Sequence, residues 1–131
     1  LRNARKFYLH KITKYITDEY DIITCEKLNT KNMIMKKELS KSINDASFSE
    51  ILRQLEYKSR YKGKYFYQID RYYPSSQECS VCGNIDKSYK DLSKRKYICS
   101  KCHNEIDRDV NASMNIMFEG LKLYMSETIK I

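Results

Sequence analysis

The chain has 131 residues, and its 25 Lys and Arg against 17 Asp and Glu give a formal net charge of +8. This length suits one domain, or a small domain with an appendage. The sequence contains no apolar run long enough to span a bilayer and no opening segment typical of a secretory signal, so we expect a cytoplasmic protein without a membrane partner. Positive charge interleaved with 12 Tyr favours a polyanionic partner, although a merely soluble basic surface also explains it.

The first half of the chain begins with a predicted helix and a predicted strand. Residues 1–20 predict an amphipathic helix with a basic face, and the β-branched run at 21–28 predicts a buried strand. Residues 29–46 are polar and rich in lysine, which is typical of a long excursion between elements. The apolar stripe expected on the first helix consists of Leu1, Ala4, Tyr8, Ile12, Tyr15 and Ile16.

A second helix and a second strand are expected next. Ser47 and Glu50 have the spacing of a capping box, so the helix should begin there and end before Gly63. Residues 64–70 alternate between polar and apolar side chains, as a strand does. The apolar stripe expected on this second helix consists of Phe48, Ile51, Leu52 and Leu55.

A closing helix is predicted after Asp109, and its interior Gly120 should cost about 1 kcal/mol in helix stability. Its expected apolar stripe consists of Val110, Met114, Met117, Leu121 and Tyr124. The order of elements is therefore helix, strand, helix, strand, cysteine-rich segment and helix. This order predicts an α/β fold with an insertion late in the chain.

Four of the five cysteines form two tight pairs separated by 16 residues, a spacing that predicts a structural zinc ribbon. Two residues between thiolates let a short turn aim both sulfurs at one Zn²⁺, and the second pair completes a tetrahedron. A turn that needs a positive φ is expected at Gly83, directly after the first pair, and the stretch between the pairs has the length of a β-hairpin or short ribbon. A pair of disulfides is disfavoured by the odd number of cysteines, and a redox pair lacks a surrounding βαβ pattern. His103 is a minor candidate to replace one of these ligands, and His10 is a weaker candidate. Cys25 is most simply a small core residue. The predicted zinc ligands are Cys79, Cys82, Cys99 and Cys102.

The segment between the cysteine pairs is basic and supplies little core, so the metal should provide most of its folding energy. Four protein ligands leave no open coordination position, and the zinc is therefore expected to be structural. A rigid, positively charged knob suits contacts with the phosphates of nucleic acid, although a charge run is also compatible with a solvated face. The residues expected to contact nucleic acid are Lys87, Lys90, Lys94, Arg95, Lys96 and Lys101.

Two carboxylates stand out from their surroundings. Glu26 lies in an otherwise apolar strand, where an unpaired carboxylate costs several kcal/mol; it is either a metal ligand or a strand-end residue that faces solvent or pairs with a lysine. Asp109 opens a helix, where an N-cap role is the simplest alternative to metal binding. Carboxylates brought together from a strand and a helix start can hold Mg²⁺ ions roughly 4 Å apart, which activate water and stabilise the leaving oxygen of a phosphodiester.

Four segments, in this order, resemble the C-terminal part of the transposon-encoded TnpB (OrfB) family, relatives of the type V CRISPR effector nucleases. A zinc ribbon followed within five residues by Asp-Arg-Asp-x-Asn-Ala is a highly specific combination, whereas either half alone is much less so. The resembling segments are 22–29, 73–83, 97–102 and 107–116.

The resemblance implies an incomplete RuvC-like, RNase H-related layer into which the zinc ribbon is inserted. It divides the chain into the end of a RuvC-like nuclease domain (1–73), the ribbon (74–104) and the final acidic motif with its helix (105–131). It also implies RNA-guided DNA cleavage, with DNA, a guide RNA and the upstream part of the same nuclease as partners. By the same resemblance, Glu26 and Asp109 correspond to the family's second and third acidic ligands of Mg²⁺ or Mn²⁺.

The resemblance leaves neighbouring residues of the last motif open. Asp107 is the fallback ligand and more simply supports the helix start. Arg108 and Asn111 are expected to orient the site or a phosphate, without an assigned role.

One departure from the family matters for activity. The family's first acidic residue lies in an Asp-x-Gly-like motif, and neither Asp18 nor Asp21 is followed by such a glycine. Because the guide-binding portion and the remaining sheet strands are also missing, we expect this chain alone to be inactive or nearly so, with an exposed apolar edge.

Two other functions remain open from the sequence. The chain can be a binding module or transposase remnant, in which the ribbon engages DNA or RNA without chemistry. It can also be a ribosomal or transcription-type zinc ribbon, but that leaves Glu26 and the Asp107–Asp109 segment without a purpose.

Overall fold

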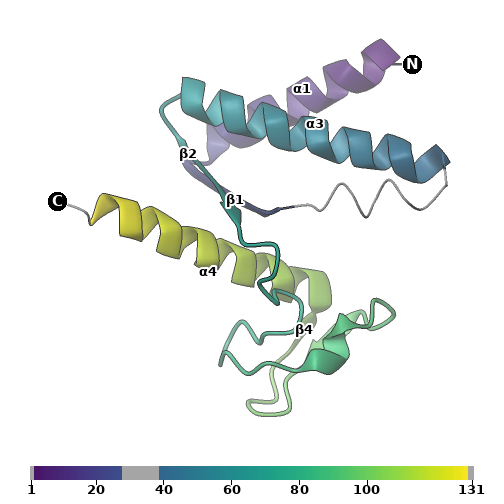
Figure 1. Ribbon diagram of the computed structural model, residues 1–131, viewed down its shortest axis with the longest axis vertical. Helices are drawn as coiled ribbons and strands as arrows, with labels where there is room; N and C mark the ends of the chain where they lie inside the picture. Colours follow the sequence, from purple (N-terminus) through teal and green to yellow (C-terminus); the bar gives the residue numbers. More distant parts are fainter. Residues whose placement is uncertain (1, 28–38, 130–131) are drawn as a thin grey trace. The chain divides into compact units, whose positions relative to one another are not determined.

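The computed structural model describes residues 2–27 and 39–129 (Figure 1). Its elements mix helices and strands, in agreement with the predicted α/β class. In chain order they are α1 (Arg2–Glu19), β1 (Ile22–Glu26), α3 (Leu39–Tyr61), β2 (Tyr65–Ile69), the 3₁₀ helix η1 (Lys87–Lys90), β3 (Lys96–Ile98), β4 (Glu105–Asp107) and α4 (Arg108–Thr128). Part of the first family-like segment, Leu28 and Asn29, lies outside the described residues.

The chain divides into two compact units. The first consists of Leu1–Ile23 and Lys27–Tyr67, and the second of Thr24–Glu26 and Gln68–Ile131. The last three residues of β1, including Glu26, therefore belong to the same unit as the cysteine pairs and α4.

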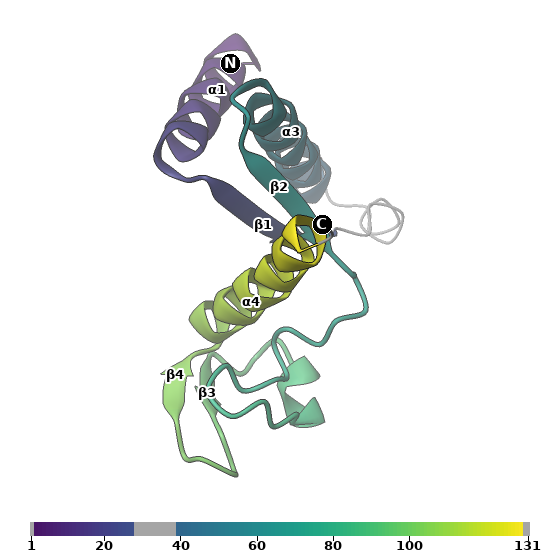
Figure 2. The same cartoon turned by 90° about the vertical axis from the view of Figure 1, so that its left-hand side faces the viewer.

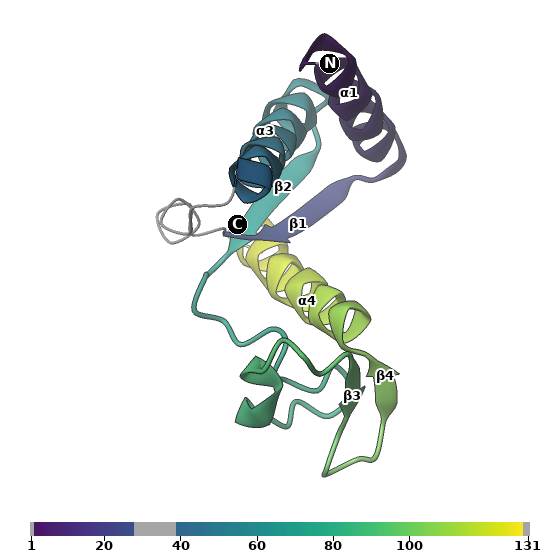
Figure 3. The same ribbon diagram turned by 90° about the vertical axis from the view of Figure 1, so that its right-hand side faces the viewer.

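Strands β1 and β2 pair with each other and run in the same direction (Figures 2 and 3). The N–H of Tyr65, the first residue of β2, donates to the carbonyl of Asp21, which directly precedes β1, at 2.9 Å. A bond between the starts of both strands requires a parallel arrangement, which in turn needs a crossover connection such as α3. The predicted strands at 21–28 and 64–70 are thus found, as the two strands of a βαβ unit.

Helices α1 and α3 lie side by side in the first unit through a largely polar contact (Figure 1). The fully buried Thr13 hydroxyl donates to Gln54 Oε1 at 2.7 Å, and Lys58 Nζ donates to that hydroxyl at 2.7 Å. Burial lowers the pKa of Lys58, which nevertheless has two oxygen acceptors in this contact. The predicted stripe on α1 is wrong at Tyr8 and Tyr15, which are exposed, because hydrogen-bonded threonines occupy the buried face.

Helix α3 begins at Leu39, eight residues before the predicted start. Ser47 is therefore inside a helix and does not cap one, so the capping-box prediction is wrong. The predicted excursion over 29–46 lies outside the described residues up to residue 38, and its remainder is helical. Of the predicted apolar stripe, Leu55 is buried whereas Phe48 is exposed. Within the described ranges, no helix combines the length and apolarity that crossing a bilayer requires.

Helix α4 buries a polar face that the sequence analysis did not predict. Its buried residues are Asn111, Asn115 and Gly120, whereas Val110 and Met117 of the predicted apolar stripe are exposed. The prediction was wrong at these positions because it ranked residues by hydrophobicity alone. Amide side chains can occupy a helix contact when backbone groups satisfy them.

Gly120 brings α4 into very close contact with β1. A Cβ atom placed on Gly120 would lie 1.9 Å from Cγ2 and 2.6 Å from Cβ of Thr24, so no larger residue fits without movement of helix or strand. The helix-propensity cost expected for this glycine therefore permits a close approach between the two elements. These are the elements that carry Glu26 and Asp109.

Replacing Gly120 by alanine tests this contact. On an exposed helical site the change would stabilise the chain by about 1 kcal/mol. Here we expect a loss of about 1–3 kcal/mol in the free energy of unfolding, because the added methyl overlaps Thr24. Urea unfolding of G120A and of the exposed control Ser113→Ala measures this, and a higher unfolding midpoint for G120A would contradict the close contact.

Candidate metal centre and acidic residues

The structure brings the four predicted zinc-ligand cysteines together. Their Sγ atoms all lie within 4.8 Å of one another, with 3.6 Å between Cys79 and Cys102 and 3.5 Å between Cys82 and Cys99. A tetrahedron with Zn–S bonds of about 2.3 Å has sulfur separations of about 3.8 Å, which these distances approach. Among the described residues this is the only cluster of three or more His, Cys, Asp or Glu ligand atoms at that spacing. The donor set therefore fits a divalent metal such as zinc.

Hydrogen bonds shape the turn around the first cysteine pair. The N–H of Gly83 donates to the carbonyl of Cys79 at 2.9 Å, and the N–H of Cys79 donates to the carbonyl of Asn84 at 2.8 Å. Gly83 has a positive φ of 75°, as its position after the first pair predicts.

The second cysteine pair repeats this turn with a different residue at the strained position. The N–H of His103 donates to the carbonyl of Cys99 at 3.0 Å, and the N–H of Cys99 donates to the carbonyl of Asn104 at 3.0 Å. His103 has a φ of 61°, which is costly for a residue with a side chain. In the described structure His103 is therefore the equivalent of Gly83 in the turn, and the ligand cluster consists of four cysteines.

Two tyrosines form a small core beside the cysteines. The Tyr97 side chain is fully buried, and its ring centroid lies 4.3 Å from that of Tyr89. Burial raises the pKa of Tyr97, so its hydroxyl stays protonated and donates to the Gln77 carbonyl at 3.1 Å. This core accompanies Cys79 and Cys99, which are also buried, and gives the segment more packing than its composition predicts.

The strand pairing of the ribbon encloses the second cysteine pair. β3 and β4 are antiparallel, and Tyr97 is paired with Ile106. The stretch between the two pairs, whose length suits a hairpin, contains the short helix η1 and strand β3, and an isolated bridge joins Glu78 and Ile85 on the two sides of the first pair. Because β4 ends at Asp107 and α4 begins at Arg108, the ribbon leads directly into the last acidic motif.

The second turn favours a thiolate at Cys99. The backbone N–H of Cys102 donates to Cys99 Sγ at 3.5 Å, and this bond lowers the pKa of the Cys99 thiol. Because thiolates are the form that binds zinc, this hydrogen bond favours Cys99 as a metal ligand.

Glu26 is the last residue of β1 and is exposed. This placement corresponds to the strand-end alternative in the sequence analysis, and it leaves the carboxylate accessible to a ligand. A carboxylate buried inside an apolar strand would need a cationic partner. Glu26 is exposed at the strand end and does not need one for this reason.

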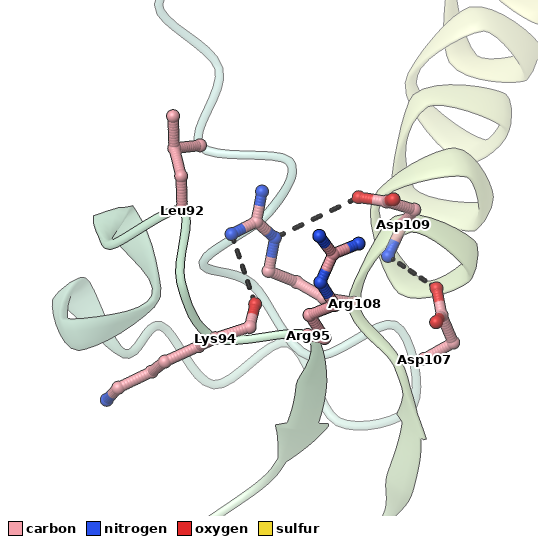
Figure 4. A pocket seen from close by; sticks show the side chains of 6 residues that line it. All are labelled: Leu92, Lys94, Arg95, Asp107, Arg108 and Asp109. Carbon is pink, nitrogen blue, oxygen red and sulfur yellow. Dashed lines mark hydrogen bonds and ion pairs between the residues drawn. The ribbon is translucent and has the colours of Figure 1, made fainter.

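Asp109 lies in the first turn of α4, and its side chain is 89% exposed. Asp107 is the N-cap, because its carboxylate accepts from the N–H group of Asp109 at 2.8 Å (Figure 4) and from that of Val110 at 3.1 Å. The N-cap alternative for Asp109 is therefore wrong, and the helix-supporting role of Asp107 is found. Asp109 has its carboxylate free for another partner, apart from a contact of 3.9 Å with Arg108 Nε.

Asp109 borders a small cavity of about 50 Å³ between the ribbon and the start of α4 (Figure 4). Arg108 is largely buried there, and its Nη1 donates to the carbonyls of Asp91 at 3.0 Å and Lys94 at 3.2 Å. Arg108 thus holds a ribbon loop against the helix start. The cavity is lined by Leu92, Lys94, Arg95, Asp107, Arg108 and Asp109.

Asn111 connects α4 to the first cysteine pair. Its amide nitrogen donates to the Glu78 carbonyl at 2.7 Å, and its amide oxygen accepts from the Ser80 N–H at 3.0 Å. Because the side chain is fully buried and both ends of its amide are hydrogen-bonded, Asn111 is not accessible to a phosphate. Of the two roles expected for it, orienting the site stays a prediction.

The six predicted nucleic-acid residues of the ribbon are all exposed. Two of them have partners within the chain: Lys96 pairs with Glu105 at 2.5 Å, and Lys94 donates to Ser88 Oγ and lies over the Tyr89 ring. The other four make no side-chain hydrogen bond or ion pair to any residue that the structure describes. They are Lys87, Lys90, Arg95 and Lys101.

The sequence model of the family described as "Cas12f1-like, TNB domain" matches residues 48–116, just over half of the chain. A "Putative RNA-guided DNA endonuclease" of Streptomyces pristinaespiralis is 35% identical over 92% of this chain and 30% of its own length. The CRISPR-associated endodeoxyribonuclease Cas12f1 of Sulfoacidibacillus thermotolerans is 26% identical over 99% of this chain and 31% of its own length. The TnpB-like protein L79 of Acanthamoeba polyphaga mimivirus is 31% identical over 92% of this chain and 24% of its own length. The chain thus spans about a third or less of these relatives.

A solved structure has the same fold. The Cas12f1 chain in a cryo-EM structure of a Cas12f1–sgRNA–target DNA complex matches with a TM-score of 0.62 and 20% identity, over 88% of this chain and 34% of that one. This match confirms the predicted α/β fold class.

Substituting one cysteine at a time tests the metal centre. We expect the native chain to bind one zinc ion and Cys99→Ser to lose most of it, because a hydroxyl replaces a thiolate ligand. Cys25→Ser is the matched control, since Cys25 is outside the cluster. Zinc content by atomic emission after gel filtration is the measurement, and equal zinc in C99S and native chains would contradict the four-sulfur site.

Replacing His103 by glycine tests its conformational role. Because His103 has the left-handed φ that Gly83 has in the other turn, H103G should stabilise the ribbon by about 1 kcal/mol and keep its zinc. Gly83→Ala, the reverse change, should destabilise it. Thermal unfolding of the zinc-loaded variants measures both, and loss of zinc from H103G would show instead that the imidazole is a ligand.

Proposed function

We infer the function of this chain from its family, because it belongs to the Cas12f1-like, TNB domain family and is a relative of the TnpB proteins and of the type V effectors. We propose that it is the C-terminal portion of an RNA-guided DNA endonuclease that hydrolyses phosphodiester bonds with divalent metal ions. Its partners in this proposal are DNA, a guide RNA and the upstream part of the same protein.

The observation that carries the proposal is the packing of α4 on β1 within one unit. Thr24 and Gly120 touch, so the strand that ends in Glu26 and the helix whose first turn contains Asp109 are neighbouring elements. Both carboxylates are exposed and chemically available. Glu26 and Asp109 would hold Mg²⁺ or Mn²⁺, hard cations that prefer carboxylate oxygens and, when bound, supply activation of water and charge stabilisation.

The chain alone should have little or no activity. Among the described residues neither Glu26 nor Asp109 belongs to a cluster of three or more ligand side chains. Two acids hold divalent ions weakly, and relatives that match this chain are about three times as long or longer. The remaining acid belongs in this proposal to the upstream part of the nuclease.

The ribbon contributes binding and not hydrolysis in this proposal. Four cysteines fill the coordination of a zinc ion, so that ion is structural. Lys87, Lys90, Arg95 and Lys101 are exposed on the ribbon and in this proposal contact phosphates. The same feature favours the second candidate function, a ribbon that binds DNA or RNA without cleaving it.

Substituting the acids tests the proposal. In the full-length protein assembled with guide RNA, Glu26→Ala or Asp109→Ala should lower the rate of target-DNA cleavage about 100-fold or more, because each removes a charge that the reaction requires. Asp107→Asn is the matched control, since asparagine still caps α4 and should leave cleavage nearly unchanged.

Two outcomes separate the candidates. Cleavage that survives both alanine substitutions would overturn the nuclease assignment. A complete protein that never cuts, yet binds DNA with an affinity that falls steeply with salt, would establish the binding module instead.

A further inference from the structure

Two asparagines on α4 are buried although the helix is otherwise largely exposed. Asn111 is 0% and Asn115 3% exposed. Burying an amide is unfavourable by about 1–3 kcal/mol unless its groups find hydrogen-bond partners. The burial of two such amides, four residues apart on one helix face, indicates that their contacts have a specific purpose.

Their partners are backbone groups on both sides of the first metal-ligating cysteine. Asn111 bonds to the Glu78 carbonyl and the Ser80 N–H, the two neighbours of Cys79. Asn115 donates to the same Glu78 carbonyl at 2.7 Å and to the Ser75 carbonyl at 2.8 Å. Glu78 and Ser80 are covalently bonded to Cys79, so a metal ion that held its sulfur would also restrict these backbone groups and the amides bonded to them.

Asp109 depends on these contacts for its position. It lies two residues before Asn111, roughly 3 Å along the helix axis. Its own carboxylate is 89% exposed, and among residues 2–27 and 39–129 its ion-pair contact is the one of 3.9 Å with Arg108, so its placement follows that of the helix backbone.

A second contact keeps the helix from sliding. Gly120 touches Thr24 of β1 with no room for a methyl group. A helix fixed at Asn111 and at Gly120 can neither rotate nor shift along its axis without breaking buried hydrogen bonds or overlapping β1.

We propose that Asn111 and Asn115 are positioning residues that tie the first turn of α4, and therefore Asp109, to the cysteine cluster. The structural metal then has a second role: it holds the acidic residue in place for Mg²⁺ binding, in addition to folding the ribbon. The effect on Mg²⁺ binding by Asp109 rests on the proposed nuclease function. The link between α4 and the cysteine cluster through Asn111 and Asn115 does not depend on that function.

The tie is tested by amide hydrogen exchange in the zinc-loaded chain. Replacing both asparagines by alanine should raise exchange over residues 108–112 about tenfold while one zinc ion stays bound. Removing zinc from the native chain should give a similar rise, and removing it from the double variant should add little. Ser113→Ala, between the two asparagines and exposed, is the control and should exchange as the native chain does.

Native-like exchange in the double variant, or an undiminished effect of zinc removal in it, would overturn the tie. If the double variant binds no zinc, Asn115→Ala alone provides the test, because Asn111 still contacts the ribbon. An intermediate rise in exchange is then expected, and native-like exchange would again overturn the proposal.

The consequence for catalysis is measured in the full-length protein with guide RNA. The double variant should require several-fold more Mg²⁺ for half-maximal cleavage, with a rate near native at saturating Mg²⁺. An unchanged Mg²⁺ midpoint, in a protein that Asp109→Ala inactivates, would overturn the positioning role and leave the proposed function intact. Cleavage that survives Asp109→Ala would instead reject the proposed function, whatever the exchange result.

Discussion

Four cysteine sulfurs kept within 4.8 Å of one another are the constraint on which the second unit depends. Thiolates at this separation repel one another unless a divalent cation lies between them, so binding of a metal here would be coupled to folding of the ribbon. The two turns, the tyrosine core and the β3–β4 pairing all surround this cluster. Through Asn111 and Asn115 the same constraint reaches the helix that carries the last acidic motif.

The elements of the fold were predictable where local pattern determines them. Alternation located β2, and the turn requirement after a cysteine pair identified the positive φ of Gly83. The start of α3 was not predictable from Ser47, because a sequence with capping-box spacing can also occur inside a longer helix, where it does not mark the N-terminus. Which face of α1 is buried was also missed, since Thr13 gains its partners only from α3, distant in sequence.

The candidate site could be predicted where chemistry follows from spacing. The cysteine pairs predicted a cluster that the structure assembles, and family resemblance selected Glu26 and Asp109, whose role as a pair stays a prediction. The asparagines and Gly120 were misjudged for a common physical reason. These residues contact groups from other segments, such as the Glu78 carbonyl and Thr24. The sequence around each residue does not indicate which distant groups will lie beside it.

X-ray absorption at the zinc edge of the zinc-loaded chain tests the central claim most directly. Four sulfur neighbours at about 2.3 Å, with no nitrogen or oxygen in the first coordination sphere, are the predicted result. A sphere that contains an imidazole nitrogen, or a chain whose cysteines form disulfides and bind no zinc, would contradict it. Either result would remove the metal-fixed backbone beside Cys79 on which the placement of α4 depends.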